Sequence, residues 1–209
     1  STMKAKNTLP NFSVLFTGPA GTGKTASCYQ IAKRTNRYIY FIDLEKIHSK
    51  WVGESSKNVV ALFNEIKEIN KFLDDDCIAV FNECDSVISK RVAVTTSTDQ
   101  SMNGTINNFL QEFEQFSGIA FLTTNLASNF DSAFMRRILM KFLINAPEPA
   151  VRKRILTKVF DDITPETIDK INSQYTLTGG LISNISKKLL VKTLLDDTIN
   201  KDEYIGIAN

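Results

Sequence analysis

The chain has 209 residues, of which 43% are hydrophobic and 23% charged, a composition typical of a globular protein with one sizeable core and room for a small second domain. Its 25 basic and 23 acidic residues are mixed along the sequence, so no basic stripe favours a nucleic-acid partner. No apolar run approaches the ~18 residues of a membrane span, and no signal-peptide pattern opens the chain. With three cysteines, an odd number, we expect a cytoplasmic protein, and without a membrane-spanning run we expect no membrane partner. Met3 follows two small residues, which suggests a fragment of a longer chain.

Short apolar runs alternate with longer segments of helical spacing over the first two thirds of the chain. Strands are predicted at 12–18, 38–44, 77–83, 119–125 and 141–146. Their continuous rather than alternating apolarity indicates a parallel sheet that is buried on both faces. Helices are predicted between them at 24–35, 55–70, 100–116 and 131–139. This pattern predicts an α/β fold with a five-stranded parallel sheet sandwiched by helices.

The composition changes at 145–151, where Pro147 and Pro149 interrupt regular structure. Everything afterwards has helical spacing, and helices are predicted at 150–160, 164–174 and 178–195. Thr164 followed by Pro165 predicts a cap and a first-turn proline for the second of these. We therefore predict an α/β domain at 1–147 and a small all-helical domain at 148–209.

The sequence GPAGTGKT at 18–25 fits the pattern G-x-x-x-x-G-K-[ST], and it follows a predicted strand and opens a predicted helix. Glycines in that setting let backbone N–H groups close around phosphate oxygens, and the helix N-terminus adds its positive dipole end. We expect Lys24 to reach the β- and γ-phosphates and Thr25 to place its hydroxyl on Mg²⁺. The predicted nucleotide-binding residues are Gly18, Pro19, Ala20, Gly21, Thr22, Gly23, Lys24, Thr25 and Ala26. The alternative is a glycine-rich turn without a ligand.

The stretch CIAVFNECDSV at 77–87 ends a predicted strand with polar and acidic residues. Together with the glycine loop upstream, Glu83 is predicted to orient the attacking water, so that the reaction would be hydrolysis. The alternative for Glu83 is a solvated charge at the end of a strand. Asn82 stands where a carboxylate near the metal is usual, and its carbonyl oxygen can still accept a hydrogen bond from a metal-bound water. The missing charge is expected to weaken metal affinity rather than abolish it. Asn125 ends the next predicted strand, where its amide could contact the γ-phosphate or the water, although an Asn there is often only a turn former.

These motifs, in this order, resemble the AAA subgroup of the AAA+ ATPases. The residues that carry the resemblance are GPAGTGKT (Walker A), AVFNECDS (Walker B), SKWVGESSKNV (first pore loop), FLTTNLASNFDSAFMRR (second region of homology) and TLTGGLISNISKKL (lid segment). The resemblance implies a P-loop NTPase fold with a helical lid at 148–209, with Gly179 and Gly180 near the adenine. It also implies that Asn125 is the sensor 1 residue and that Arg136 and Arg137 are arginine fingers that reach the γ-phosphate bound by the next subunit.

Because those arginines act in trans, the resemblance implies a ring, most often a hexamer in this family. It likens Trp51, Val52 and Gly53 to a pore loop that grips an unfolded polypeptide, while a core tryptophan is the alternative. The Asn82–Glu83 pair departs from the usual Walker B Asp and resembles a bacterial branch that reads FNEAD. No arginine follows Gly179 and Gly180 on the lid helix, so a sensor 2 charge is not expected.

Three functions are consistent with this sequence. The leading prediction is Mg²⁺-dependent binding and hydrolysis of ATP, which drives remodelling or unfolding of a protein substrate. A second is a nucleotide-gated interaction module in which Asn82 has made hydrolysis negligible. A third is a DNA-transaction ATPase, which the near-neutral charge and the Trp51 segment disfavour.

Overall fold

The computed structural model describes residues 11–44, 55–85, 97–125 and 132–195. The chain divides into two compact units, one formed by Ser1–Gly18 and Lys24–Leu143 and the other by Pro19–Gly23 and Ile144–Asn209. The second unit therefore begins at Ile144 and includes part of the glycine-rich loop, whereas the sequence placed the domain boundary after residue 147.

The first unit contains one sheet of five parallel strands in the order β2-β3-β4-β1-β5. The strands are β1 (Asn11–Thr17), β2 (Ile39–Asp43), β3 (Ile78–Asn82), β4 (Gly118–Thr124) and β5 (Met140–Leu143). The three central strands, β3, β4 and β1, are largely buried, as their continuous apolar sequence predicts. Because the strands are parallel, the carboxyl ends of β1, β3 and β4 lie at one edge of the sheet, where α/β proteins bind their ligands.

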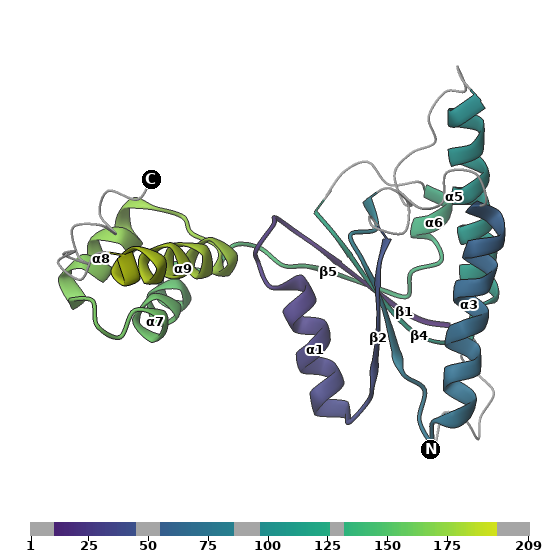
Figure 1. Ribbon diagram of the computed structural model, residues 1–209, viewed down its shortest axis with the longest axis horizontal. Helices are drawn as coiled ribbons and strands as arrows, with labels where there is room; N and C mark the ends of the chain where they lie inside the picture. Colours follow the sequence, from purple (N-terminus) through teal and green to yellow (C-terminus); the bar gives the residue numbers. More distant parts are fainter. Residues whose placement is uncertain (1–10, 45–54, 86–96, 126–131, 196–209) are drawn as a thin grey trace. The chain divides into compact units, whose positions relative to one another are not determined.

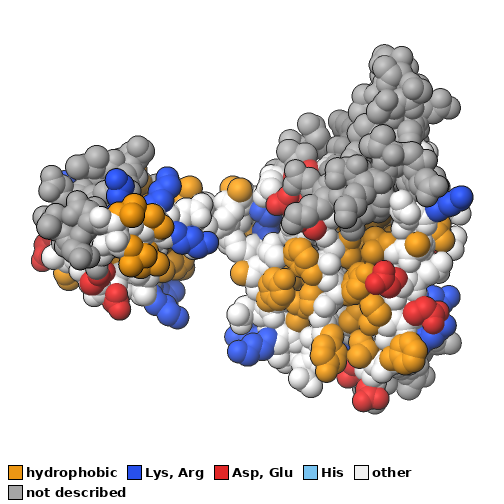
Figure 2. All heavy atoms as spheres, in the orientation of Figure 1, with side chains coloured by type: hydrophobic (Ala, Val, Ile, Leu, Met, Phe, Trp, Pro, Cys, Tyr) orange, Lys and Arg blue, Asp and Glu red, His pale blue; other side chains and the backbone are white. Residues whose placement is uncertain are grey.

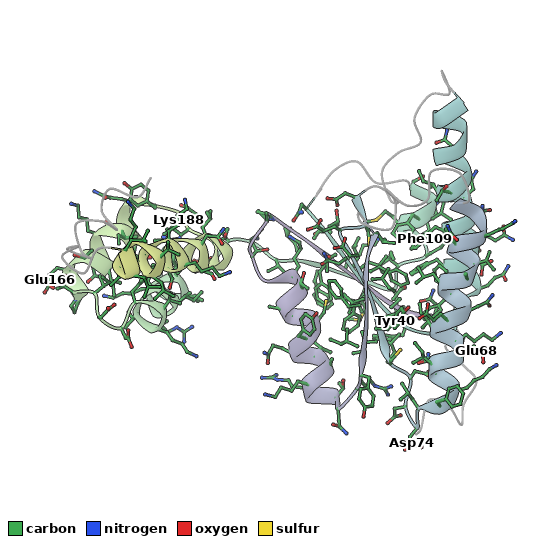
Figure 3. The ribbon with its side chains drawn as sticks, in the orientation of Figure 1. Tyr40, Glu68, Asp74, Phe109, Glu166 and Lys188 are labelled. Atoms are coloured by element: carbon green, nitrogen blue, oxygen red, sulfur yellow. The ribbon has the colours of Figure 1, made fainter. Side chains whose placement is uncertain are left out.

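Helix α1 (Lys24–Thr35) covers one face of the sheet, and α3 (Ser55–Phe72) and α5 (Ser97–Gln115) cover the other (Figure 1). The core under α3 and α5 is rich in aromatic rings. Phe109 of α5, labelled in Figure 3, has its ring centre 5.5 Å from those of Phe63 and Phe81. Phe81 lies in β3, directly before Asn82 and Glu83, so these residues extend from a strand that is firmly packed.

Helix α6 (Ser132–Met135) is much shorter than the predicted helix at 131–139. The reason is a contact with β1: the Ser13 hydroxyl donates to the carbonyl of Arg137 at 3.0 Å and accepts the N–H of Leu139 at 3.1 Å. These two hydrogen bonds direct the chain into the sheet, and β5 begins one residue later, at Met140.

The prediction that the fifth strand is buried on both faces was wrong. All four residues of β5 are exposed, because β5 is at the edge of the sheet and β1 is its one partner among the described strands. Figure 2 shows hydrophobic side chains at the surface of the first unit, and Met140, Phe142 and Leu143 of β5 are among its exposed large hydrophobic residues.

The described part of the second unit is helical apart from its connecting segments, with α7 (Pro149–Val159), α8 (Pro165–Gln174) and α9 (Gly179–Leu195). Its core is formed by apolar residues from all three helices and from the loop between α7 and α8, namely Leu156, Phe160, Ile163, Ile168, Ile171, Ile182 and Leu189. The predicted start of α8 is confirmed, because the Thr164 hydroxyl accepts the N–H of Thr167 and Pro165 is the first helical residue. Among the described residues of both units, no helix is long and apolar enough to cross a membrane.

Candidate active site

The loop at 18–25 joins β1 to α1, which is the context that its glycine pattern predicts. Gly21 and Gly23 have φ angles of 74° and 100°, in the left-handed region that side-chain-bearing residues rarely adopt. A Cβ at Gly23 would meet no atom within 4 Å, so the backbone conformation rather than crowding requires a glycine there. At the base of the loop, the Lys24 ammonium donates to the carbonyl of Gly18 at 2.8 Å.

Within the second unit, the Pro19–Gly23 part of the loop contacts the start of α9. The N–H of Gly180 donates to the carbonyl of Gly21 at 2.8 Å. A Cβ on Gly180 would lie 2.7 Å from the Cα of Gly21, so a side chain at 180 would push the two backbones apart. Of the two glycines that the sequence placed near the adenine, Gly180 therefore touches the phosphate loop itself.

Lys24 and Asn125 come together from distant parts of the sequence. Lys24 is only 8% exposed, and its ammonium donates to Asn125 Oδ1 at 2.7 Å. Burial lowers the pKa of Lys24, while the negative charges of Asp85 and Glu83 oppose this shift. The contact places the end of β4 next to the lysine that is predicted to bind phosphate.

Asn82 lies at the centre of a small hydrogen-bonded network. Its Oδ1 accepts the hydroxyl of Thr25 at 2.9 Å and the hydroxyl of Thr123 at 2.9 Å. The backbone N–H of Glu83 donates to the same Thr123 oxygen at 3.1 Å. Glu83 has a φ of 55°, which is uncommon for a residue other than glycine and is often found at functional sites.

Asp85 extends this network toward β4. One of its carboxylate oxygens accepts the hydroxyl of Thr124 and, at 3.3 Å, the backbone N–H of Asn125. Sequence reasoning did not assign a role to Thr123 or Thr124. The sequence does show two hydroxyl side chains at the end of the apolar run IAFLTT. Their neighbours are known only once the register of β4 against β3 is known. Phe81 pairs with Leu122, so Thr123 follows beside Asn82.

The two candidate arginine fingers, which follow α6, have different surroundings. Arg137 forms an ion pair with Glu114 of α5, with Nη2 2.8 Å from Oε2. Arg136 is exposed, and no hydrogen bond or ion pair joins its side chain to any described residue. The predicted pore-loop residues Trp51, Val52 and Gly53 lie outside the described residues.

The oxygen atoms around Asn82 fit a magnesium ion better than a metal that requires a cage of protein ligands. In the described part of the chain, no group of three or more His, Cys, Asp or Glu side chains could hold a metal by itself. Mg²⁺ in nucleotide sites typically has one or two protein ligands and completes its shell with phosphate oxygens and water. The Thr25 hydroxyl beside Asn82 and Glu83 is a donor set of that kind.

A comparison with known families identifies the chain. The family described as "ATPase family associated with various cellular activities (AAA)" matches residues 14–146, which is most of the chain. The chain belongs to the AAA family. It is therefore an ATPase module, as its nucleotide-binding motifs indicate.

Several relatives of this AAA module have names that describe their biology. It is 28% identical over 214 residues to cell division protein C of Sulfolobus acidocaldarius, covering 94% of this chain and 55% of that protein. It is 29% identical to the human pachytene checkpoint protein 2 homolog (94% of this chain, 49% of the relative) and 26% identical to the spastin homolog of Caenorhabditis elegans (84% and 31%). The AAA module thus spans about half or less of the length of these relatives. They are archaeal and eukaryotic, and so they do not support the bacterial branch suggested by the Asn82–Glu83 pair.

A solved structure supports the fold of this AAA module. The AAA domain of FIGL-1 in complex with ADP has a TM-score of 0.69 at 25% sequence identity, covering 93% of this chain and 67% of the other. The predicted P-loop fold with a five-stranded parallel sheet flanked by helices is thereby confirmed.

Proposed function

We propose that this AAA module hydrolyses Mg²⁺-bound ATP as part of a ring and uses the reaction to remodel or unfold a protein substrate in the cytoplasm. The observation that carries the proposal is the meeting of Lys24, Thr25, Asn82, Glu83 and Asn125 at one edge of the sheet. Hydrogen bonds join Lys24 to Asn125 and Thr25 to Asn82, and Glu83 directly follows Asn82.

Each of these residues has a separate task in the proposed reaction. Lys24 supplies positive charge to the β- and γ-phosphates, and Thr25 and Asn82 hold Mg²⁺, Asn82 through a water molecule. Bound Mg²⁺ neutralises charge that develops on the phosphate oxygens. The Glu83 carboxylate accepts a hydrogen bond from the attacking water and orients it, and Asn125 contacts the γ-phosphate or the same water. Catalysis in such a site comes mainly from positioning and electrostatics.

The proposals of a ring and of a protein substrate are supported by membership of the AAA family and by residues outside this network. In the proposed ring, arginines of one subunit reach the nucleotide of the next, and Arg136 is exposed. A hexamer is the proposed state. Trp51, Val52 and Gly53 are proposed to contact an extended segment of the protein substrate.

The test of the proposed function is ATP turnover by the wild-type chain and by Glu83→Gln. We expect turnover per chain to increase with protein concentration, because a neighbouring arginine is required. We expect Glu83→Gln to lower kcat by about 10²-fold or more and to keep nucleotide affinity within about threefold, since the substitution removes the water-orienting carboxylate but no phosphate contact. Turnover that Glu83→Gln leaves unchanged would falsify the assignment of Glu83.

The missing negative charge at Asn82 favours one alternative, a nucleotide-gated module with negligible hydrolysis. The variant Asn82→Asp separates the two functions because it restores that charge in the same network. If the site is a working ATPase, we expect turnover to change by less than about tenfold. A gain of several orders of magnitude would instead identify a site that Asn82 has silenced.

A further inference from the structure

Thr123 occupies a place in the network that the assigned roles do not explain. It is 1% exposed, at the end of β4, and does not belong to the phosphate loop or to the Asn82–Glu83 pair. Its hydroxyl donates to Asn82 Oδ1 at 2.9 Å and accepts the N–H of Glu83 at 3.1 Å. Its backbone carbonyl accepts the N–H of Cys84 at 2.9 Å. One residue of β4 therefore contacts three successive residues, the last residue of β3 and the two that follow it.

The contact with Asn82 has a consequence specific to an amide. The two oxygens of a carboxylate are equivalent acceptors, whereas an amide has one acceptor oxygen and one donor nitrogen. An Asn at this position can therefore accept the hydrogen bond of the Thr25 hydroxyl only when its oxygen faces that hydroxyl. The Thr123 hydroxyl donates to that same oxygen and opposes a flip that would turn the NH₂ group toward Thr25 and the metal position.

The contact with Glu83 fixes a backbone conformation. The φ of 55° at Glu83 is unfavourable for a residue with a Cβ, so it needs support from neighbouring groups. The hydroxyl and the carbonyl of Thr123 hold the N–H groups of Glu83 and Cys84 on both sides of this residue. The direction in which the Glu83 side chain leaves the strand end depends on these two hydrogen bonds.

We propose that Thr123 is a positioning residue that sets the amide orientation of Asn82 and the backbone of Glu83, and thereby the Mg²⁺ dependence of nucleotide binding and the rate of hydrolysis. The inference rests on the proposed function. Thr123 acts through Asn82 and Glu83 and forms no part of the phosphate loop.

The first test compares Thr123→Val, which keeps the shape and removes the hydroxyl, with Thr123→Ser, which keeps the hydroxyl. Affinity for ADP is measured by calorimetry with Mg²⁺ and with EDTA, and turnover does not enter the readout because ADP is the product of the proposed hydrolysis rather than its substrate. Losing one net hydrogen bond corresponds to about a two- to tenfold change. We expect Thr123→Val to weaken binding by about this factor with Mg²⁺ and to leave binding in EDTA unchanged, and Thr123→Ser to restore the wild-type value.

The second test asks whether Thr123 acts through the amide. In an Asn82→Asp background the orientation of the group no longer matters, because both carboxylate oxygens accept. The loss caused by Thr123→Val with Mg²⁺ should therefore shrink to less than about twofold in that background. An equal loss in both backgrounds, or an equal loss with Mg²⁺ and with EDTA, would overturn the proposal.

Two further measurements keep the outcomes distinct. Hydrolysis by Thr123→Val alone should show a fall in kcat of about tenfold or more with a KM that rises less than kcat falls. If Thr123→Val does not fold, Thr123→Ala carries the same comparison with Thr123→Ser. Failure of the proposed function would appear as unchanged turnover in Glu83→Gln, whereas failure of the present inference would appear as wild-type Mg²⁺ dependence in the Thr123 variants.

Discussion

Arg136 and Arg137 are adjacent in the sequence, yet their side chains have different surroundings. Arg137 is ion-paired with Glu114, whereas Arg136 makes no side-chain hydrogen bond or ion pair with the described residues. We therefore predict that Arg136→Ala lowers ATP turnover at high protein concentration by about 10²-fold or more without changing the melting temperature. Arg137→Ala should lower the free energy of unfolding by roughly 0.2–1 kcal/mol, because the ion pair between Arg137 and Glu114 is partly exposed.

Glu114→Gln is the matched control for these arginines. It removes the ion pair of Arg137 and keeps both arginines, so it should reproduce the small stability loss of Arg137→Ala. Turnover in Glu114→Gln should stay near the wild-type value. If Arg136→Ala instead lowered thermal stability and left turnover unchanged, Arg136 would have a structural role within its own chain.

The residues that could be predicted from the sequence are those whose spacing is itself the signal. Lys24 and Thr25 follow from the glycine pattern, and Glu83 follows from its place after an apolar run in a chain that also carries that glycine pattern. Thr123 could not be predicted, because its role depends on the register of β3 against β4. The different surroundings of Arg136 and Arg137 depend on Glu114, a residue of α5 that bonds to Arg137. No local sequence pattern indicates that contact.

Among the elements, α7 and α8 are joined by a buried charged side chain. Arg152 of α7 is only 5% exposed, and its guanidinium donates to the side-chain and backbone oxygens of Asn172, both at 2.9 Å, and to the carbonyl of Pro147 at 3.2 Å. Removing the guanidinium leaves these partly buried oxygens without their donor. We predict that Arg152→Ala lowers the free energy of unfolding of the second unit by roughly 2–4 kcal/mol, measured by urea titration with far-UV circular dichroism.

Arg154 provides the control on the same helix. It is exposed, and replacing it with Ala removes the same number of atoms without breaking the contacts of Arg152. Arg154→Ala should change the free energy of unfolding by less than about 0.5 kcal/mol. Equal effects of the two substitutions would show that the Arg152 contacts contribute nothing to the packing of α7 on α8.

Most elements follow from their periodicity, and the exceptions have physical causes outside the element. The central strands and the long helices lie within a few residues of their predicted bounds, because their apolar residues face a core on one or both sides. Helix α6 ends early because Ser13 of β1 binds the chain at Arg137 and Leu139. The side chains of β5 are exposed because this strand is at the edge of the sheet, and the order of the strands in space determines which strand is there.

At the scale of the whole molecule, the cysteines distinguish the two units. All three, Cys28, Cys77 and Cys84, are buried in the first unit. Burial raises the pKa of the Cys28 thiol to about 12 and also raises the pKa values of Cys77 and Cys84. Because the thiolate is the reactive form, we predict that iodoacetamide at pH 8 labels the native chain slowly and the urea-unfolded chain quickly, as counted by mass spectrometry. Rapid labelling of the native chain would show that the first unit opens readily.

The raised thiol pKa values also predict a dependence of stability on pH. Above the ordinary thiol pKa of about 8.5, the unfolded chain loses these protons while the folded chain keeps them. The folded state then binds more protons than the unfolded state, so the free energy of unfolding falls as pH rises. Urea titrations at pH 7.5 and 9.5 should show this loss, and a Cys84→Ala variant should show less of it. A stability that is equal at the two pH values would contradict the prediction.

The left-handed backbone at Glu83 implies that thermal stability and ATP hydrolysis favour different residues at this position. A non-glycine residue in this conformation is less stable by roughly 1–2 kcal/mol, which a glycine would largely recover. Glu83→Gly is thus expected to melt at a higher temperature than Glu83→Gln, while both variants lose most of their turnover. A screen of variants for survival on heating alone would favour loss of the carboxylate on which hydrolysis depends. Engineering this module for durability therefore has to select for turnover at the same time.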